Sequence, residues 1–181
     1  MMDIFDLRLQ KAVENDFPKI RAFYDAVIDK TKGMEKHARW KKGSHPSDCS
    51  IRNYIKNGDM YICMHGEQLA AALAVPFYQD EEYRQINWGI SAADNEVATL
   101  HLFAVAPELQ GKGCGKAVMA LAIGMASDNG MKVFRLDAIA PNAPAHRLYA
   151  SIGFQLRGKQ HLYTDNVGWV DFYYYEKSLQ S

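Results

Sequence analysis

Residues 110–115 read Gln-Gly-Lys-Gly-Cys-Gly, and this glycine-rich stretch joins two segments of different character. The run from Thr99 to Pro107 before it has the apolar composition of a strand, and the run from Lys116 to Met125 after it is typical of a helix. The first N–H groups of a helix have no acceptor within the helix and carry a partial positive charge, so they favour an anion. We therefore predict a strand, a turn and a helix with a phosphate site at the turn.

The alternate glycines strengthen this prediction. Gly111, Gly113 and Gly115 have no Cβ, so the chain can adopt positive φ and a pyrophosphate can approach the backbone closely. An ordinary tight turn is the alternative. Two nucleotide-binding motifs fail on spacing, because a P-loop would need glycine where Gln110 stands and a dinucleotide fingerprint would need a small residue where Lys116 stands.

Length and composition exclude several classes of protein. At 181 residues and 48% hydrophobic content, the chain suits one domain over residues 1–181. Its formal net charge is zero, so no global basic field is present to bind nucleic acid or an anionic membrane. The three cysteines are too few and too widely spaced for a disulfide framework or a zinc site. With no run of about 18 apolar residues, we expect a cytoplasmic protein.

The rest of the chain alternates strand-like and helix-like segments. The predicted strands lie at 7–13, 60–64, 68–75, 99–105, 133–139, 154–162 and 169–176, and the second and third of them form a hairpin. The first predicted helix follows a cap at Asn15 and has Tyr24 in its apolar stripe, and the second runs from 48 to 57 between Ser47 as cap and Gly58 as stop. Two more helices begin at 116, with Leu121 expected to be buried, and at 143. Strands 99–105 and 133–139 are joined by a crossover helix, so they should pair in parallel. Residues 78–96 are polar and are expected to form a surface excursion, either a connector or a substrate-contacting loop. The fold class is α/β, with a mixed sheet and helices on both faces.

A second segment, Asn142 to Phe154, has the pattern N-x-x-A-x-x-x-Y-x-x-x-G-F. Together with the pattern Q-x-x-G-x-G at 110–115, it resembles the GNAT superfamily of acetyl-CoA-dependent N-acetyltransferases over about residues 99–154. The resemblance implies a single-domain GNAT-like fold, whose sheet is mostly antiparallel with one central parallel strand pair. It also implies acetyl-CoA as cosubstrate and no metal.

The resemblance assigns roles to individual residues. The loop that would bind the CoA diphosphate comprises Gln110, Gly111, Lys112, Gly113, Cys114, Gly115 and Lys116. Asn142 would contact the pantetheine arm, and Tyr149 would protonate the departing thiolate. The main chain of Phe103 would polarise the acyl carbonyl, and that of Val105 would pair with the pantetheine amide. A core aromatic is the alternative for Tyr149, and packing is the expected role of the Cys114 side chain.

An amine nucleophile must lose a proton, and His101 is the best candidate base. Strand alternation places it on the same face as Thr99 and Phe103, although a buried polar residue of the sheet is the alternative. Many family members carry a glutamate where this chain has Thr99. That difference shifts the role of base to His101 or to a water relay, with Glu96 as a weaker second base.

We therefore predict an N-acetyltransferase that moves an acetyl group to a primary amine of a small molecule or peptide by direct attack. A non-catalytic acyl-CoA sensor is the alternative, and a pure interaction protein is a third. The presence of both His101 and Tyr149 argues against the sensor. The acceptor and the acyl-chain preference are not determined, and a homodimer is left open. Trp40, Tyr163 and Trp169 are candidates to line the acceptor site, and His146 is expected to be exposed.

Overall fold

The computed structural model describes residues 6–180, which form two compact units. The first unit comprises the chain up to Lys32 together with Trp40–Val75 and His101–Ala122. The second comprises Gly33–Arg39, Pro76–Leu100 and the chain from Ile123 onward. Strand β4 (Val97–Val105) belongs to both, because its first four residues lie in the second unit and the remainder lies in the first. The expected single domain over residues 1–181 stays a prediction.

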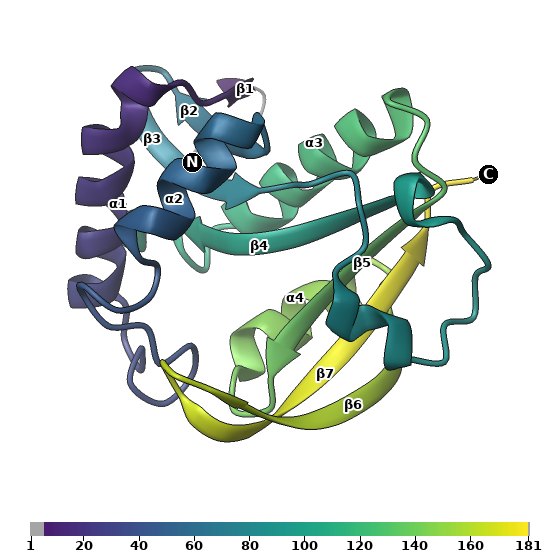
Figure 1. Ribbon diagram of the computed structural model, residues 1–181. Coiled ribbons are helices and arrows are strands. Elements are labelled where there is room, and N and C mark those ends of the chain that lie inside the picture. The colour runs from purple at the N-terminus through teal and green to yellow at the C-terminus, as the bar shows by residue number, and fades with distance from the viewer. Residues whose placement is uncertain (1–5, 181) are drawn as a thin grey trace. The chain divides into compact units, whose positions relative to one another are not determined.

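The first unit is an antiparallel sheet with helices. Its elements are β1 (Leu7–Lys11), α1 (Phe17–Lys30), α2 (Asp48–Asn57), β2 (Met60–His65), β3 (Gln68–Ala74), the second part of β4 and the start of α3 (Cys114–Asp128) (Figure 1). Strand β1 pairs with β2, β2 with β3, and β3 with the second part of β4, each antiparallel. The hairpin predicted from residues 60–75 is therefore confirmed.

The ends of the first two helices show how the local sequence determines them. The Ser47 hydroxyl accepts a hydrogen bond from the Ser50 N–H at 3.1 Å, and Gly58 ends α2 with a φ of 77°, both as predicted. The predicted cap at Asn15 is wrong, because Asp16 is the N-cap of α1. The Asp16 carboxylate accepts from the Val13 N–H at 2.9 Å, which closes a short turn before the helix.

Helices cover both faces of the first sheet, as predicted. The Lys19 ammonium of α1 lies 3.6 Å from the Met64 sulfur of β2. The neighbouring side chain on β2, Cys63, points to the opposite face, where burial and then the Cys114 thiol of α3 raise its pKa to about 12. The predicted burial of Leu121 on α3 is wrong, since its side chain is 37% exposed.

The second unit holds the parallel strand pair. Its elements are the first part of β4, β5 (Val133–Ile139), α4 (Ala143–Ser151), β6 (Gln155–Thr164) and β7 (Gly168–Ser178). The first part of β4 pairs in parallel with β5, while β5 with β7 and β7 with β6 are antiparallel. Among the strand pairings within residues 6–180, β4 with β5 is the one parallel pair, so the predicted fold class is confirmed.

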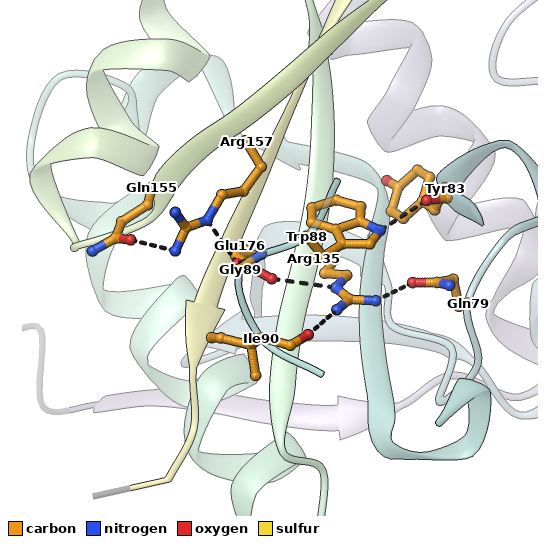
Figure 2. A network of polar contacts seen from close by, with 9 residues as sticks. All are labelled: Gln79, Tyr83, Trp88, Gly89, Ile90, Arg135, Gln155, Arg157 and Glu176. Atoms are coloured by element: carbon orange, nitrogen blue, oxygen red, sulfur yellow. Dashed lines mark hydrogen bonds and ion pairs between the residues drawn. The ribbon is translucent and has the colours of Figure 1, made fainter. Parts of the chain in front are cut away.

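The excursion at residues 78–96 is anchored to this sheet by a buried ion pair. Arg135 of β5 and Glu176 of β7 lie directly opposite each other and are 2% and 1% exposed (Figure 2). The Arg135 guanidinium also donates to the Gln79 side chain and, at 2.6 Å, to the Ile90 carbonyl. The Glu176 carboxylate accepts from the Gly89 N–H at 2.7 Å. Two chain segments of the excursion are thus fixed by one pair of charges.

Aromatic side chains complete the anchor. The Trp88 ring lies over the Arg135 guanidinium at 4.3 Å, and its Nε1 donates to the Tyr83 carbonyl at 2.8 Å (Figure 2). The Tyr83 hydroxyl in turn donates to the Asp137 carboxylate of β5 at 2.8 Å. Most of residues 78–96 are exposed, as predicted, but Tyr83 and Ile86 are buried. The polar composition of the segment does not reveal these few buried anchors.

Candidate functional site

The glycine turn has the predicted backbone at two of its three glycines. Gly111 and Gly113 have φ values of 73° and 85°, a region that residues with a Cβ rarely adopt. Helix α3 begins at Cys114, two residues before the predicted start, and the Gly113 carbonyl accepts from the Ala117 N–H at 3.2 Å. Gly115 therefore lies in the first helical turn and has no positive φ.

The turn suits a diphosphate. A Cβ added at Gly111 would meet no atom within 4 Å, so the backbone there is open to a ligand. The first N–H groups of α3 have no acceptor within the helix, and the Lys112 and Lys116 side chains nearby are exposed. The Cys114 thiol is buried, and burial raises its pKa, so its side chain packs as predicted and its backbone N–H remains for a ligand.

Gln110 connects this turn by hydrogen bonds to two other elements of the first unit. Its Nε2 donates to the Val105 carbonyl at 3.0 Å and lies 2.9 Å from the Thr31 hydroxyl, just after α1. The Ala106 N–H donates to the Ala70 carbonyl of β3 at 2.8 Å. Since N–H groups alternate in direction along a strand, those of Val105 and Phe103 point away from β3. The geometry thus fits main-chain roles for both residues.

Strand β4 is distorted immediately before Phe103. Leu102 has a φ of 52°, and the register with β3 shifts between Ala72 and Ala74. The buried Tyr24 hydroxyl of α1 donates to the Leu102 carbonyl at 2.6 Å. Sequence analysis placed Tyr24 in the apolar stripe of the helix but missed this bond. The signal was the tyrosine itself, because a buried phenol needs a hydrogen-bond partner.

His101 lies among aromatic rings of the first unit. Its half-buried ring stacks on Tyr54 of α2, with centroids 5.9 Å apart and planes 15° apart. Burial and then His101 lower the pKa of His45, whose ring contacts Trp40 at 5.6 Å. Sequence analysis identified His101 and Trp40 but missed Tyr54 and His45, which come from segments without a motif.

Thr99 and Glu96, which lie in or next to the strand of the predicted base His101, both make structural contacts. Thr99 is buried, and its hydroxyl donates to the Tyr78 carbonyl at 3.3 Å. The Glu96 carboxylate accepts from the Ala93 N–H at 2.9 Å and pairs with Lys132 at 2.5 Å. The hydrogen bond from Lys132, followed by that from the Ala93 N–H, lowers the pKa of Glu96. These contacts favour a structural role for Glu96.

In the second unit, Asn142 immediately precedes the helix that the second motif predicted, and Tyr149 lies within it. The Asn142 side chain caps α4 by accepting from the Ala145 N–H at 3.3 Å. Tyr149 is buried between the rings of Tyr175 and Phe154, with centroids 6.0 and 5.9 Å away. Burial, and then Asp137, raise the pKa of Tyr149 far above its usual value, so its hydroxyl stays protonated at neutral pH.

The predicted site residues thus fall into two sets. The first unit brings together the glycine turn, the β4 backbone and His101, and the second unit holds Asn142 and Tyr149. The predicted exposure of His146 is wrong, because its ring is half-buried and hydrogen-bonded. Tyr163 and Trp169, candidates for the acceptor site, are 58% and 66% exposed on β6 and β7.

Comparison with known proteins identifies the family. A family model described as the acetyltransferase (GNAT) family matches residues 21–154. The chain belongs to this family. A search of curated proteins by sequence gives no significant match. The GNAT assignment therefore rests on the family model, and the fold agrees with it.

Solved structures share the fold at low sequence identity. A GNAT family acetyltransferase from Streptococcus agalactiae has a TM-score of 0.75 and 19% identity, covering 97% of this chain and 96% of that one. YncA from Salmonella typhimurium, solved with its cofactor acetyl-CoA, has a TM-score of 0.67 and 18% identity, covering 97% and 95%. The ribosomal-protein-S18-alanine N-acetyltransferase from Escherichia coli has a TM-score of 0.66 and 18% identity, with the same coverage.

Two features are absent from residues 6–180, the part of the chain that the structure describes. In that part of the chain, no group of three or more His, Cys, Asp or Glu side chains is arranged to bind a metal ion. None of the helices described there is long and apolar enough to cross a membrane.

Proposed function

We propose that this protein is an acetyl-CoA-dependent N-acetyltransferase that moves the acetyl group to a primary amine of a small molecule or peptide. The observation that carries the proposal is the glycine turn, with Gly111 and Gly113 at positive φ before the N-terminus of α3. Membership of the GNAT family supports the reaction class, and acetyl-CoA in the YncA structure supports the donor. We further propose that the protein acts as one domain in the cytoplasm.

The donor is held mainly by backbone groups. The diphosphate binds the N–H groups of residues 111–116, and the exposed Lys112 and Lys116 supply positive charge. Val105 pairs with the pantetheine amide through its N–H, and Asn142 contacts the pantetheine arm. The Phe103 N–H donates to the acyl oxygen, where negative charge develops in the transition state.

The reaction proceeds by direct attack. His101, directly or through water, removes a proton from the ammonium group, and the neutral amine attacks the thioester carbonyl. The C–N bond forms, the C–S bond breaks, and the electron pair of that bond leaves on sulfur. As the amide forms, the attacking nitrogen loses its second proton to water, and Tyr149 gives its proton to the thiolate and is reprotonated from solvent. Because its pKa is raised, full proton transfer is uphill, so a strong hydrogen bond to the developing thiolate is the larger part of its effect.

An acyl-CoA sensor without turnover is the alternative. It would need the glycine turn and Asn142 but neither of the proton-handling groups. The presence of both the buried, protonated Tyr149 and His101 favours the enzyme. An interaction protein would bind no CoA at all, so a calorimetric titration with CoA separates it from both.

The test measures thiol released from acetyl-CoA with a panel of primary amines. We expect Tyr149→Phe to lower turnover while CoA affinity stays within about threefold, because the hydroxyl acts on the leaving group. The matched control is Tyr61→Phe, which removes the hydroxyl of another buried tyrosine, on β2. Tight CoA binding without thiol release would favour the sensor, and a Tyr149→Phe variant at the wild-type rate would remove the acid role.

A further inference from the structure

His146 connects three elements of the second unit through its two ring nitrogens. Its Nδ1 lies 2.7 Å from the Tyr175 hydroxyl on β7. Its Nε2 lies 3.1 Å from the Ile139 carbonyl and 3.2 Å from the Ala140 carbonyl, at the end of β5. His146 itself belongs to the first turns of α4, one turn before Tyr149.

The partners determine the tautomer. A carbonyl oxygen can only accept, so Nε2 must carry a proton and donate to Ile139 and Ala140. In the neutral ring Nδ1 is then an acceptor, and the Tyr175 hydroxyl donates to it. Burial, and then Tyr173, raise the pKa of Tyr175, which keeps that donor protonated.

These hydrogen bonds lie on either side of Asn142 and Tyr149, the two residues that the second motif singled out. The Ile139 and Ala140 carbonyls lead into the turn where Asn142 caps α4, and the Ile139 carbonyl also accepts from the Asn142 N–H at 2.9 Å. On the other side, the Tyr175 ring packs against Tyr149 with centroids 6.0 Å apart. The hydrogen bonds of His146 to the end of β5 and to Tyr175 of β7 therefore fix the rotation of α4 relative to these two strands.

We propose that His146 is a positioning residue for acetyl transfer, which orients Tyr149 by tying α4 to the end of β5 and to the Tyr175 hydroxyl. This inference rests on the proposed function, because it assumes that Tyr149 acts on the leaving thiolate. His146 touches neither substrate, and its effect passes through Tyr149. A displacement of about 1 Å at a reacting group costs up to about a hundredfold in rate.

The kinetic test compares three replacements at saturating substrates. His146→Leu removes both bonds and should lower kcat about tenfold or more while the KM of the amine stays within about twofold. His146→Gln keeps a donor for the carbonyls and should recover most of the loss. Tyr175→Phe removes one hydroxyl without changing the ring, so it should fold normally and show a smaller decrease of kcat.

A double variant tests whether the effect passes through Tyr149. If it does, His146→Leu combined with Tyr149→Phe should be no more than about twofold slower than Tyr149→Phe alone. Independently of activity, the ¹⁵N spectrum of the wild-type imidazole should show the Nε2–H tautomer. The Nδ1 resonance should move in Tyr175→Phe.

Three results would overturn the inference while leaving the proposed function intact. These are wild-type kcat in His146→Leu, rate losses that multiply in the double variant, and an Nδ1–H tautomer in the wild-type spectrum. The absence of thiol release by the wild-type protein with every amine would instead overturn the proposed function, and the inference with it. Melting temperatures of all variants near that of the wild type would confirm that the kinetic changes are not due to unfolding.

Discussion

The replacement Glu176→Gln tests the buried ion pair that anchors residues 78–96. It keeps the size of the side chain and an oxygen for the Gly89 N–H but removes the charge. The Arg135 guanidinium, 2% exposed, would then lie beside an uncharged amide. Its remaining partners would be the Gln79 side chain, the Ile90 carbonyl and the Trp88 ring.

The expected loss of stability is large for one substitution. Removing one partner of a buried ion pair costs about 3–5 kcal/mol, because a buried charge is left uncompensated. Two oxygens and an aromatic ring remain around Arg135, so we expect about 3 kcal/mol, the lower end of that range. For a chain of this length 1 kcal/mol shifts the melting temperature by about 2–4 °C, which gives a decrease of about 6–12 °C.

Urea unfolding and thermal melting measure this loss, and amide hydrogen exchange shows where it acts. Protection should fall first in residues 78–96, which the ion pair holds to the sheet. The control Glu67→Gln, in the exposed turn between β2 and β3, should change stability by less than about 0.5 kcal/mol. Replacing both buried charges, with Arg135→Met and Glu176→Leu, should recover part of the loss, because no buried unpaired charge then remains. Arg157, whose Nε lies 2.7 Å from the Glu176 carboxylate, also loses a partner, but its side chain is 30% exposed and can turn to solvent.

The reasoning would be refuted if Glu176→Gln lay within about 1 kcal/mol of the wild type. It would also be refuted if the double replacement were as unstable as the single one. Either result would mean that Glu176 does not compensate the buried charge.

Three further predictions concern the first unit. Gly113→Val should abolish CoA binding in calorimetry, because Gly113 has a φ of 85° and lies where we propose that the phosphate binds. Gly124→Ala inside α3 should bind CoA normally, and equal affinity of the two variants would argue against the proposed role of the turn. Tyr24→Phe leaves the Leu102 carbonyl without its donor and should lower the free energy of unfolding in urea by about 1–3 kcal/mol. It should also lower kcat, because the bond holds the distorted part of β4 next to Phe103, and wild-type values for both would contradict this. Iodoacetamide at pH 8 should label only Cys49 in the folded protein, because burial raises the pKa of the Cys63 and Cys114 thiols and their thiolates form only at higher pH. Mass spectrometry counts the adducts, and fast labelling of all three cysteines would disprove the burial.

Local signals allowed much of the fold to be predicted from the sequence. Helix α2 has both bounds as predicted, because Ser47 and Gly58 are strong start and stop signals and each acts within one turn. The parallel pairing of β4 with β5 follows from the crossover rule and is confirmed. The start of α3 was placed two residues late, because the glycines at 113 and 115 look alike in sequence but differ in φ.

The parts of the candidate site that lie in a sequence motif could be predicted. The turn at 110–115 and the helix at 143–151 were predicted. Gly111 and Gly113 have the expected positive φ and Gly115 does not, and the cap that Asn142 makes on the helix was not predicted. The partners that come from distant segments could not be predicted, as with the Tyr24 hydroxyl on Leu102 or the Tyr175 hydroxyl on His146. Such contacts depend on tertiary packing, which leaves no periodic signal along one chain.

The central claim is acetyl transfer from acetyl-CoA to an amine, and product analysis tests it most directly. Wild-type protein is incubated with acetyl-CoA and a panel of primary amines, and free thiol is measured beside the N-acetylated product by mass spectrometry. The account predicts that, for at least one amine, one thiol is released for each acetylated amine and that Gly113→Val releases none. Thiol release without any acetylated amine, or no release above the protein-free rate with any amine, would contradict it.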